Sequence, residues 1–224
     1  MDKAIVDYYD RLAPEYDSDR FAGTYGRFVD EQERAILGAT RGLSGAVLDV
    51  GCGTGRLTGF ATHGCDASAE SVRIATAKHP GKQFEVADAT AALPFADASF
   101  DGATCFHVLM HLDGPSVAGL LAQVARVLKP GGVFVVDCAS ATRRGLGRRR
   151  ADGWHGSTSL TQGEFAALGR AAGLELERMD GTLMLPIHRL PAALRMPLRP
   201  LDSLACALAP DLASYLVATF RRAG

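Results

Sequence analysis

The chain has 224 residues, 47% of them hydrophobic, with 24 basic and 25 acidic side chains and a formal net charge of -1. This length and apolar content suit a single domain, residues 1–224, with a substantial core. The balanced charge provides no global cationic field, so a general nucleic-acid-binding protein is disfavoured. The N-terminus lacks a signal-peptide layout and no apolar stretch reaches a membrane-spanning length, so we expect a cytoplasmic protein.

The cysteines are odd in number and form no C-x-x-C pair. This usage favours reduced thiols over a disulfide framework or a zinc site, and we expect no metal. They stand at Cys52, Cys65, Cys105, Cys138 and Cys206.

The first strand is expected at 46–50, an apolar run that leads into a glycine-rich loop. The loop does not fit a dinucleotide fingerprint, because its third glycine is Gly55 and Arg56 stands where that glycine should be. It does not fit a P-loop either, because Gly55 is not followed by Lys and Ser or Thr. Neither common phosphate-binding loop is therefore present.

The pattern that remains is D-x-G-x-G-x-G, with Asp49 ahead of Gly51, Gly53 and Gly55. Glycines allow the backbone to approach a ligand closely, and the carboxylate favours a ligand with positive charge over a pyrophosphate. S-adenosylmethionine (SAM) has an ammonium, a sulfonium, a ribose diol and an adenine amine, but no phosphate. We therefore expect a SAM site here.

The second strand is expected to end at Asp66, which would accept hydrogen bonds from the ribose hydroxyls. Only 66 − 55 = 11 residues lie between Gly55 and Asp66. A crossover with a full helix needs at least about 10 to 12 residues before any strand is counted. The helix after the glycine loop should therefore be reduced to about one turn or lost.

Further strands are expected at 83–88 and 100–106, then at 133–137 after a helix over 116–128. A helix over 69–79 precedes the first of these, and Asp88 could accept the adenine amine. Strands at 174–185 and 214–222 complete the set, the last one antiparallel. This alternation predicts an α/β, Rossmann-like, doubly wound fold with a mainly parallel seven-stranded sheet and helices on both faces.

Three features lie between the expected fifth strand and the C-terminus. The basic segment 141–150 is typical of a flexible loop that is either solvated surface or a clamp for an anionic group, and Trp154 and His155 follow it. Thr161 and Glu164 form a capping-box pattern for a helix that closes at Gly173.

The insertion 186–211 is rich in proline, leucine and arginine and is long for a hairpin connection. Its apolar side could lie over the substrate pocket, or make peripheral contact with lipid with arginines at the rim. The simpler interpretation, slightly preferred, is a surface cap that completes the core.

The sequence resembles the class I SAM-dependent methyltransferases, particularly the small-molecule enzymes of the methyltransferase-11 type. The resemblance runs from Tyr8 to Gly173 and depends on five segments: "YYDRLAPEYD" (8–17), "VLDVGCGTGRL" (47–57), "GCDAS" (64–68), "VADATAALPFADASFDGATCFHVLMHL" (86–112) and "ARVLKPGGVFVVD" (125–137). It implies an N-terminal helical lid over 1–40, a cofactor-binding core over 45–137 and a substrate-side segment over 138–224.

The resemblance also implies the cofactor-binding residues. Asp49 and the glycine loop would line the methionine part of SAM, Asp66 the ribose, and Asp88 with Ala89 the adenine. The expected set is Tyr9, Tyr16, Asp49, Gly51, Cys52, Gly53, Gly55, Asp66, Ala67, Asp88, Ala89, Cys105 and Phe106.

Two histidines are candidates for catalysis. His107 and His111 follow the fourth strand at i, i+4 spacing, where they would share a helix face. His111 matches a histidine usual in the family that could simply support the loop, whereas His107 departs from the usual residue and could be tuned to this substrate. The pair lacks the acidic companion of a zinc motif.

These features predict a methyltransferase for a small apolar or aromatic metabolite, with transfer to oxygen favoured over nitrogen or carbon. The alternatives are a quinone- or lipid-type methyltransferase, and a SAM-binding protein that does not transfer methyl, either cyclase-like or regulatory. A nucleic-acid-binding protein that uses the arginine segment is a third. We expect S-adenosylhomocysteine as product, no nucleic-acid partner, and a monomer or homodimer.

Overall fold

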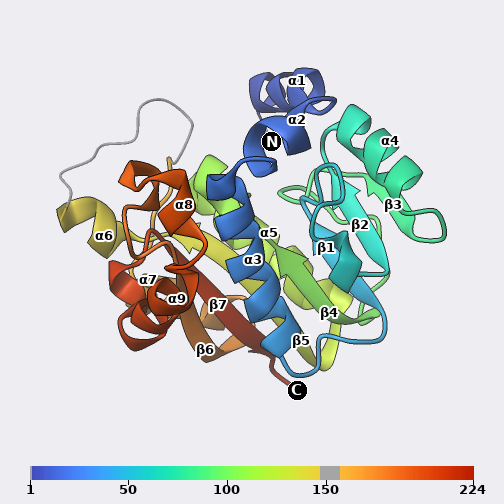
Figure 1. Cartoon of the computed structure of the whole chain (residues 1–224). Coiled ribbons are helices and arrows are strands. Elements are labelled where there is room, and N and C mark those ends of the chain that lie inside the picture. Colours follow the sequence, from blue (N-terminus) through green and yellow to red (C-terminus); the bar gives the residue numbers. More distant parts are fainter. Residues whose placement is uncertain (1, 147–156) are drawn as a thin grey trace.

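The computed structural model describes residues 2–146 and 157–224, and seven strands within them form one sheet in the order β3-β2-β1-β4-β5-β7-β6 (Figure 1). β7 is antiparallel to β5 and β6, and the other pairs are parallel. The strands are β1 (Val47–Val50), β2 (His63–Asp66), β3 (Gln83–Val86), β4 (Phe100–Cys105), β5 (Leu128–Ala139), β6 (Leu174–Thr182) and β7 (Tyr215–Arg222). The predicted fold class is confirmed.

Helices cover both faces of this sheet. They are α1 (Lys3–Leu12), α2 (Tyr16–Phe21), α3 (Thr24–Ala39), α4 (Ala69–Lys78), α5 (Gly114–Val127), α6 (Ala141–Leu146), α7 (Gln162–Ala171), α8 (Ala192–Arg195) and α9 (Arg199–Leu208). No helix among the described residues has the length and apolar character needed to cross a bilayer.

The alternation of side chains along β5 divides the core between the two faces. Val133 and Val135 pack with Leu37 of α3, whereas Phe134 and Val136 join the larger cluster that contains the leucines of α5. Successive residues of a strand point to opposite faces, so an uninterrupted apolar run is what a strand covered on both sides requires. Because the helices cover the two faces of the sheet, the carboxyl ends of the central strands are the place left for a ligand-binding site.

The crossover from β1 to β2 is as short as the sequence predicts. It contains only a single 3₁₀ turn, η1 (Thr58–Phe60), in place of a full helix. The Lys82 ammonium donates to the carbonyl oxygens of Thr58 and Ala61, so it partners groups that a longer helix would have bonded internally. β2 nevertheless pairs in parallel with β1, with Cys65 opposite Val50, and Asp66 is its last residue.

β5 begins earlier than predicted. The expected strand covers 133–137, but β5 already pairs with β4 at Leu128, opposite Phe100. The register then shifts, so that Gly102 pairs with Val133 and the Lys-Pro-Gly-Gly stretch forms a bulge rather than a separate turn. α5 ends at Val127 rather than at the expected residue 128, and Pro130 with the two glycines after it lies inside the irregular strand β5.

The C-terminal part combines confirmed and unpredicted elements. Thr161 and Glu164 form the predicted capping box of α7, and Gly173 follows with φ +80°. Segment 141–150 begins as helix α6 rather than as a loop, and its part beyond Leu146 lies, with Trp154 and His155, outside the described residues. The insertion forms η3 (Ile187–Arg189), α8 and α9, followed by η4 (Pro210–Leu212).

Candidate active site

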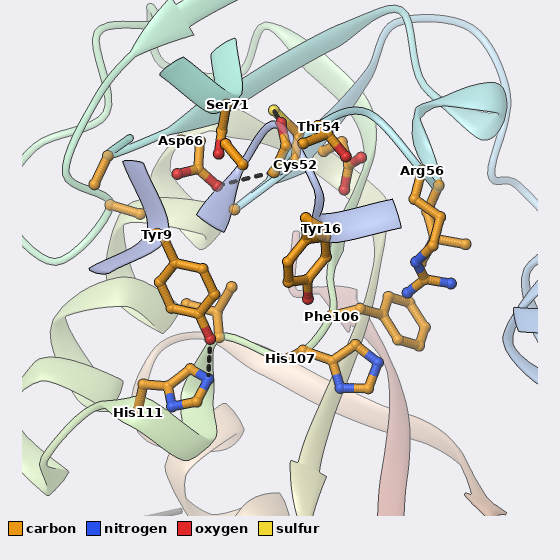
Figure 2. Close-up of a pocket in the computed structure, with 18 of the residues that line it drawn as sticks. Tyr9, Tyr16, Cys52, Thr54, Arg56, Asp66, Ser71, Phe106, His107 and His111 are labelled. Atoms are coloured by element: carbon orange, nitrogen blue, oxygen red, sulfur yellow. Dashed lines mark hydrogen bonds between the residues drawn. The ribbon is translucent and has the colours of Figure 1, made fainter. Parts of the chain in front are cut away.

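A pocket lies at the carboxyl ends of β1, β2 and β4, and residues of α1 and α2 also line it (Figure 2). Ligands of open α/β sheets bind at this edge. Its lining residues are Ile5, Tyr9, Ala13, Tyr16, Asp49, Gly51, Cys52, Gly53, Thr54, Arg56, Leu57, Asp66, Ala67, Ser71, Ala87, Ala89, Phe106, His107, Val108 and His111.

The glycine loop forms one wall of the pocket with its backbone. Gly51 has φ +68°, and a Cβ there would lie 2.2 Å from Cγ2 of Val108. The amide groups of Gly51 and Cys52 both donate to the Cys65 carbonyl, at 2.8 and 3.0 Å. Only glycine meets both the positive φ and the close approach at position 51.

Asp49 is buried at the end of β1. Its carboxylate accepts hydrogen bonds from the Thr104 hydroxyl at 2.9 Å and the Thr58 hydroxyl at 2.8 Å. Burial raises the pKa of this carboxyl, although the two hydroxyls partly offset that effect. A cationic ligand in the pocket would relieve the cost of desolvating the charge.

Asp66 turns its carboxylate toward the glycine loop, as Figure 2 shows. Oδ2 accepts from the Gly53 amide at 2.9 Å, and Oδ1 accepts from the Ser68 amide at 2.8 Å. Burial raises its pKa, and these backbone donors act in the opposite direction. Each carboxylate oxygen has a second lone pair, so the ribose contact predicted for Asp66 remains geometrically available.

Helix α1 is held against the core by two sets of polar contacts. The Tyr9 hydroxyl lies 3.0 Å from Nε2 of His111, across the pocket. Oδ1 of Asp10 accepts from the Ser68 hydroxyl at 2.6 Å and from the Glu70 amide at 3.2 Å, at the start of α4. A carboxylate at a helix N-terminus is favoured by the unpaired amides and the dipole there.

Helix α2 contributes a second attachment and an aromatic wall. Asp17 accepts from the Thr54 hydroxyl of the glycine loop at 2.7 Å and pairs with Lys78 of α4. Tyr16 faces the pocket next to Tyr9, with ring centroids 6.2 Å apart. Helices α1 and α2 therefore line one side of the pocket, and α2 contacts the glycine loop directly.

His107 and His111 do not share a helix face, which corrects the prediction. Only His111 is helical, at the end of η2 (Leu109–His111), whereas His107 has φ +60°. His107 is held in this uncommon conformation by Asp137, whose Oδ1 accepts from the His107 amide at 2.6 Å. The two imidazoles consequently have different partners on different sides of the pocket.

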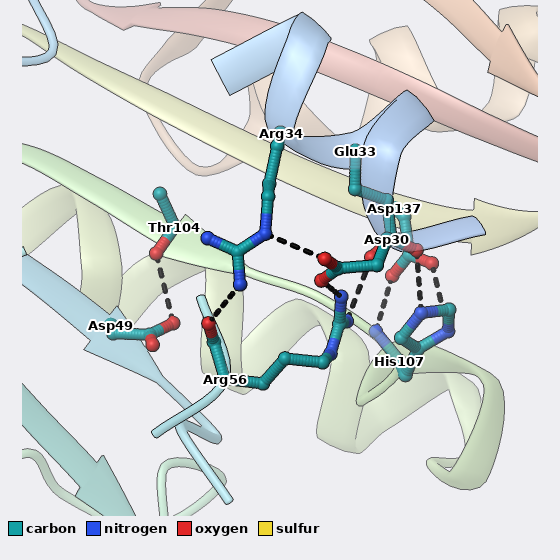
Figure 3. Close-up of polar contacts among 8 residues, drawn as sticks. All are labelled: Asp30, Glu33, Arg34, Asp49, Arg56, Thr104, His107 and Asp137. Carbon is teal, nitrogen blue, oxygen red and sulfur yellow. Dashed lines mark hydrogen bonds and ion pairs between the residues drawn. The ribbon is translucent and has the colours of Figure 1, made fainter. Parts of the chain in front are cut away.

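The His107 ring lies between two buried carboxylates (Figure 3). Nε2 lies 2.7 Å from Oε1 of Glu33 on α3, and Nδ1 lies 3.4 Å from Oδ2 of Asp137 at the end of β5. The first distance is that of a strong hydrogen bond, and the second is too long for one. Tyr215 packs edge-on against the ring, with centroids 5.6 Å apart.

Arg56 links this histidine to a wider network of charges. Its guanidinium pairs with Oδ1 of Asp30 and Oε2 of Glu33, both at 2.7 Å, and lies 4.1 Å above the Phe21 ring. Arg34 pairs with Asp30 at 2.7 Å and donates to the Arg56 carbonyl at 2.6 Å. The arginine that breaks the dinucleotide fingerprint thus joins the glycine loop to α3 (Figure 3).

The pKa values in this network reflect burial opposed by charge pairing. Burial alone would raise the pKa of Glu33, but His107 and Arg56 lower it. Burial alone would lower the pKa of His107, but Glu33 and Asp137 raise it. Burial raises the pKa of Asp137 to about 6, although His107 acts in the opposite direction. His107 is therefore a more basic imidazole than an isolated one.

The structure brings most of the expected site residues together. Both candidate histidines and ten of the thirteen expected cofactor residues line the pocket; the other three do not. The Gly55 carbonyl accepts from Nε2 of His79, and Cys105 is buried in the sheet. Asp88 accepts from the amide and hydroxyl of Thr90, although Ala87 and Ala89 beside it reach the pocket.

Sequence reasoning did not identify Glu33, Arg56 or Asp137 as site residues. The sequence does contain a pattern that indicates Asp137 as a site residue. Like Asp49 and Asp66, it is a polar residue at the carboxyl end of an expected strand. Glu33 gave none, because it lies on a helix 74 residues from its partner His107. In the part of the chain that is described, no group of three or more His, Cys, Asp or Glu is placed to hold a metal ion.

The residues present fit SAM. Two carboxylates with raised pKa values, the buried Asp49 and the half-buried Asp66, face a loop whose backbone lies open to the pocket at Gly53. Carboxylates repel a phosphate but attract ammonium and sulfonium groups and accept from hydroxyls. The fold is the one that class I SAM-dependent methyltransferases share, and the chemistry of the pocket suits their cofactor.

Comparison with known proteins finds methyltransferases among the similar sequences. Residues 48–136 match the family described as a methyltransferase domain. The chain is 35% identical over 139 residues to a demethylmenaquinone methyltransferase of Renibacterium salmoninarum, covering 59% of this chain and 57% of that protein. It is 40% identical over 103 residues to an O-methyltransferase of Penicillium expansum, covering 40% of this chain and 36% of that protein. Residues 48–136 thus match the methyltransferase domain family, and the chain spans 57% of the first relative's length and 36% of the second's.

Solved structures share the fold over nearly the whole chain. A possible histamine N-methyltransferase from Thermotoga maritima aligns with a TM-score of 0.71 and 20% identity, covering 96% of this chain and 97% of that one. The [4+2]-cyclase SpnF aligns with a TM-score of 0.65 and 22% identity, covering 98% of this chain and 95% of the SpnF chain. At these identities the likeness extends to the fold alone.

Proposed function

We propose that this protein transfers the methyl group of SAM to a hydroxyl oxygen of a small apolar or aromatic metabolite. The observation that carries this proposal is the position of His107, which faces the cofactor pocket while two buried carboxylates hold its ring. A base beside a methyl-donor site suits an acceptor that must lose a proton.

The acceptor class follows from the remaining walls of the pocket. Tyr16, Phe106 and Val108 present rings and a branched aliphatic side chain next to His107. Such walls bury an apolar or aromatic molecule, while a few polar groups fix its orientation. The name of one relative, a demethylmenaquinone methyltransferase, fits an apolar acceptor, and that of another, an O-methyltransferase, fits transfer to oxygen.

Bound SAM supplies an activated methyl group on a sulfonium. The protein's own residues position the reactants and exclude water from them. Tyr9 and Tyr16 exclude water, and the glycine loop fixes one side of the pocket. Most of the rate acceleration in this proposal comes from that positioning. The remaining chemical task for the side chains is to remove the proton from the acceptor's hydroxyl group.

Glu33 and His107 form the proton-accepting pair in this proposal. The Glu33 carboxylate accepts from Nε2–H of His107, which leaves the lone pair on Nδ1 and stabilises the imidazolium once Nδ1 takes the acceptor's proton. Nδ1 makes no short hydrogen bond, since Oδ2 of Asp137 lies 3.4 Å away, and once Nδ1 is protonated the imidazolium is paired with both carboxylates. His111, bonded to Tyr9, positions the lid instead.

The first test measures cofactor binding and methyl transfer on the same preparations. We expect calorimetry to show saturable binding of SAM and S-adenosylhomocysteine by the wild type, and binding about tenfold or more weaker in Asp66→Ala. Asp97→Ala is the matched control, because Asp97 is exposed and outside the pocket. Loss of binding in the control, or none in the wild type, contradicts the cofactor assignment.

The second measurement follows acceptors by mass spectrometry. Hydroxylated aromatic compounds are screened for products that gain one methyl in step with S-adenosylhomocysteine release. His107→Gln should bind SAM as the wild type does yet lose roughly 100-fold or more in kcat. SAM binding with a converted product that gains no methyl would instead assign the cyclase-like alternative.

A further inference from the structure

Helix α9 presents leucines to solvent on one face. Leu201, Leu204 and Leu208 are 57%, 57% and 78% exposed, at positions that follow one another along the helix surface. Leu194 of α8 is 50% exposed and Leu212 of η4 is 39% exposed. We call these five leucines the leucine face. These are five of the nine large exposed hydrophobic side chains in the described chain, so the exposure is concentrated in one region.

The opposite side of α9 is anchored by a buried acid. Asp202 is fully buried and accepts from the Gln32 amide at 2.8 Å and from the backbone amide of Leu185 at 2.5 Å. Cys206, one turn later, is also buried. A surface helix normally turns its apolar residues inward. Here the hydrogen bonds of Asp202 fix the reverse orientation, and the leucines cannot rotate into the core.

The charges around the leucine face have one predominant sign. Between residues 186 and 210 the only acidic residue is Asp202, which is buried. His188 and Arg189 are exposed, and Arg195 and Arg199 are partly exposed beside α3, where Arg199 pairs with Glu31. Asp211, at the far end, is partly buried. An apolar face edged by arginines complements a lipid surface with anionic headgroups.

We propose that the leucine face docks peripherally on an anionic phospholipid surface, with α9 lying in its plane. Self-association through this face would bring its own arginines opposite one another in a two-fold contact. A protein interface core is enriched in aromatic residues and methionine, whereas this face is leucine alone. In Figure 1 α8 and α9 lie beside α3, and no leucine of the face lines the cofactor pocket, so docking is independent of methyl transfer.

Vesicle cosedimentation of the full chain tests this proposal. Vesicles of phosphatidylcholine with phosphatidylglycerol are compared with phosphatidylcholine alone, at low and high salt. We expect binding to the mixed vesicles that weakens at high salt, and much weaker binding to the neutral ones. Equal binding to both vesicle types, or binding to neither, would overturn the proposal.

The triple variant Leu201→Ser, Leu204→Ser, Leu208→Ser should bind mixed vesicles at least about tenfold more weakly. The double variant Leu176→Ser, Val86→Ser removes exposed apolar side chains elsewhere and should bind as the wild type does. SAM binding and far-ultraviolet circular dichroism report that each variant is folded. A triple variant that binds vesicles normally, or a wild-type dimer that the triple variant abolishes, would assign the face to another role.

Discussion

The imidazole of His107 depends on residues from three separate parts of the chain. Its backbone conformation is set by Asp137, and its ring is oriented by Glu33, which Arg56 also contacts. The sequence singled out His107 from its place after the fourth strand. It could not supply the partners, because contacts between α3 and the ends of β4 and β5 exist only once the sheet and its helices have packed.

The Glu33→Gln variant tests whether this carboxylate tunes His107. Glu33 raises the pKa of His107, and a base acts only when neutral, so the rate should rise with pH through that pKa. The Gln amide oxygen still accepts from Nε2–H but carries no charge. The acidic limb of kcat/KM should therefore move to lower pH by about one unit or more, measured as a pH–rate profile.

Asp30→Asn is the control for this profile. Asp30 belongs to the same network but contacts Arg56 and Arg34 rather than His107. The acidic limb of the Asp30→Asn pH–rate profile should move much less than the acidic limb of the Glu33→Gln profile. If the two variants give the same profile as the wild type, His107 is not the titrating base.

Among the elements, the reduced crossover was predictable and the lid contacts were not. Counting residues between Gly55 and Asp66 is enough to exclude a full helix, because helix geometry fixes the rise of each residue. The attachments of α1 and α2 depend on single side chains such as Asp10 and Asp17, whose partners lie on other elements. Aspartates of this kind are common on any helix surface, so the sequence does not distinguish them.

The Asp10→Asn variant measures the strength of the α1 attachment. Asp10 places a charge at the N-terminus of α4, and the amide would lose that charge and weaken the bond to Ser68. Dissociation of SAM from the pocket beneath should become roughly three- to tenfold faster in stopped-flow measurements. Asp7→Asn, on the same helix but paired with exposed Lys3, should leave the rate unchanged, and an equal effect of both would contradict the attachment.

At the scale of the whole molecule, stability depends on the cluster that joins α5 and α7 to the sheet. That cluster extends from β1 to β7, and the Phe165 and Phe220 rings close it, with centroids 5.5 Å apart. Alternating apolar patterns in the sequence identify such a core in outline. They do not show how tightly one helix approaches one strand, which depends on individual side-chain volumes.

Gly169→Ala should destabilise the protein by about 1–3 kcal/mol, since the added Cβ would lie 2.3 Å from the Phe220 ring. Urea unfolding measures the change in the free energy of unfolding. The matched control is Gly163→Ala on the same helix, where a Cβ meets nothing within 4 Å. It should be neutral or stabilising by up to about 1 kcal/mol, and a similar loss in both variants would contradict the packing explanation.

Because α1 and α2 line the pocket, a cysteine within it can serve as a chemical probe for displacement of these helices. All five cysteines are free and buried, and of these only Cys52 lines the cofactor pocket in the described structure. Burial raises the pKa of its thiol, which lowers its expected reactivity in the enclosed pocket. The rate at which a small alkylating reagent modifies Cys52 would then follow the fraction of molecules with α1 and α2 displaced, and bound cofactor should slow it.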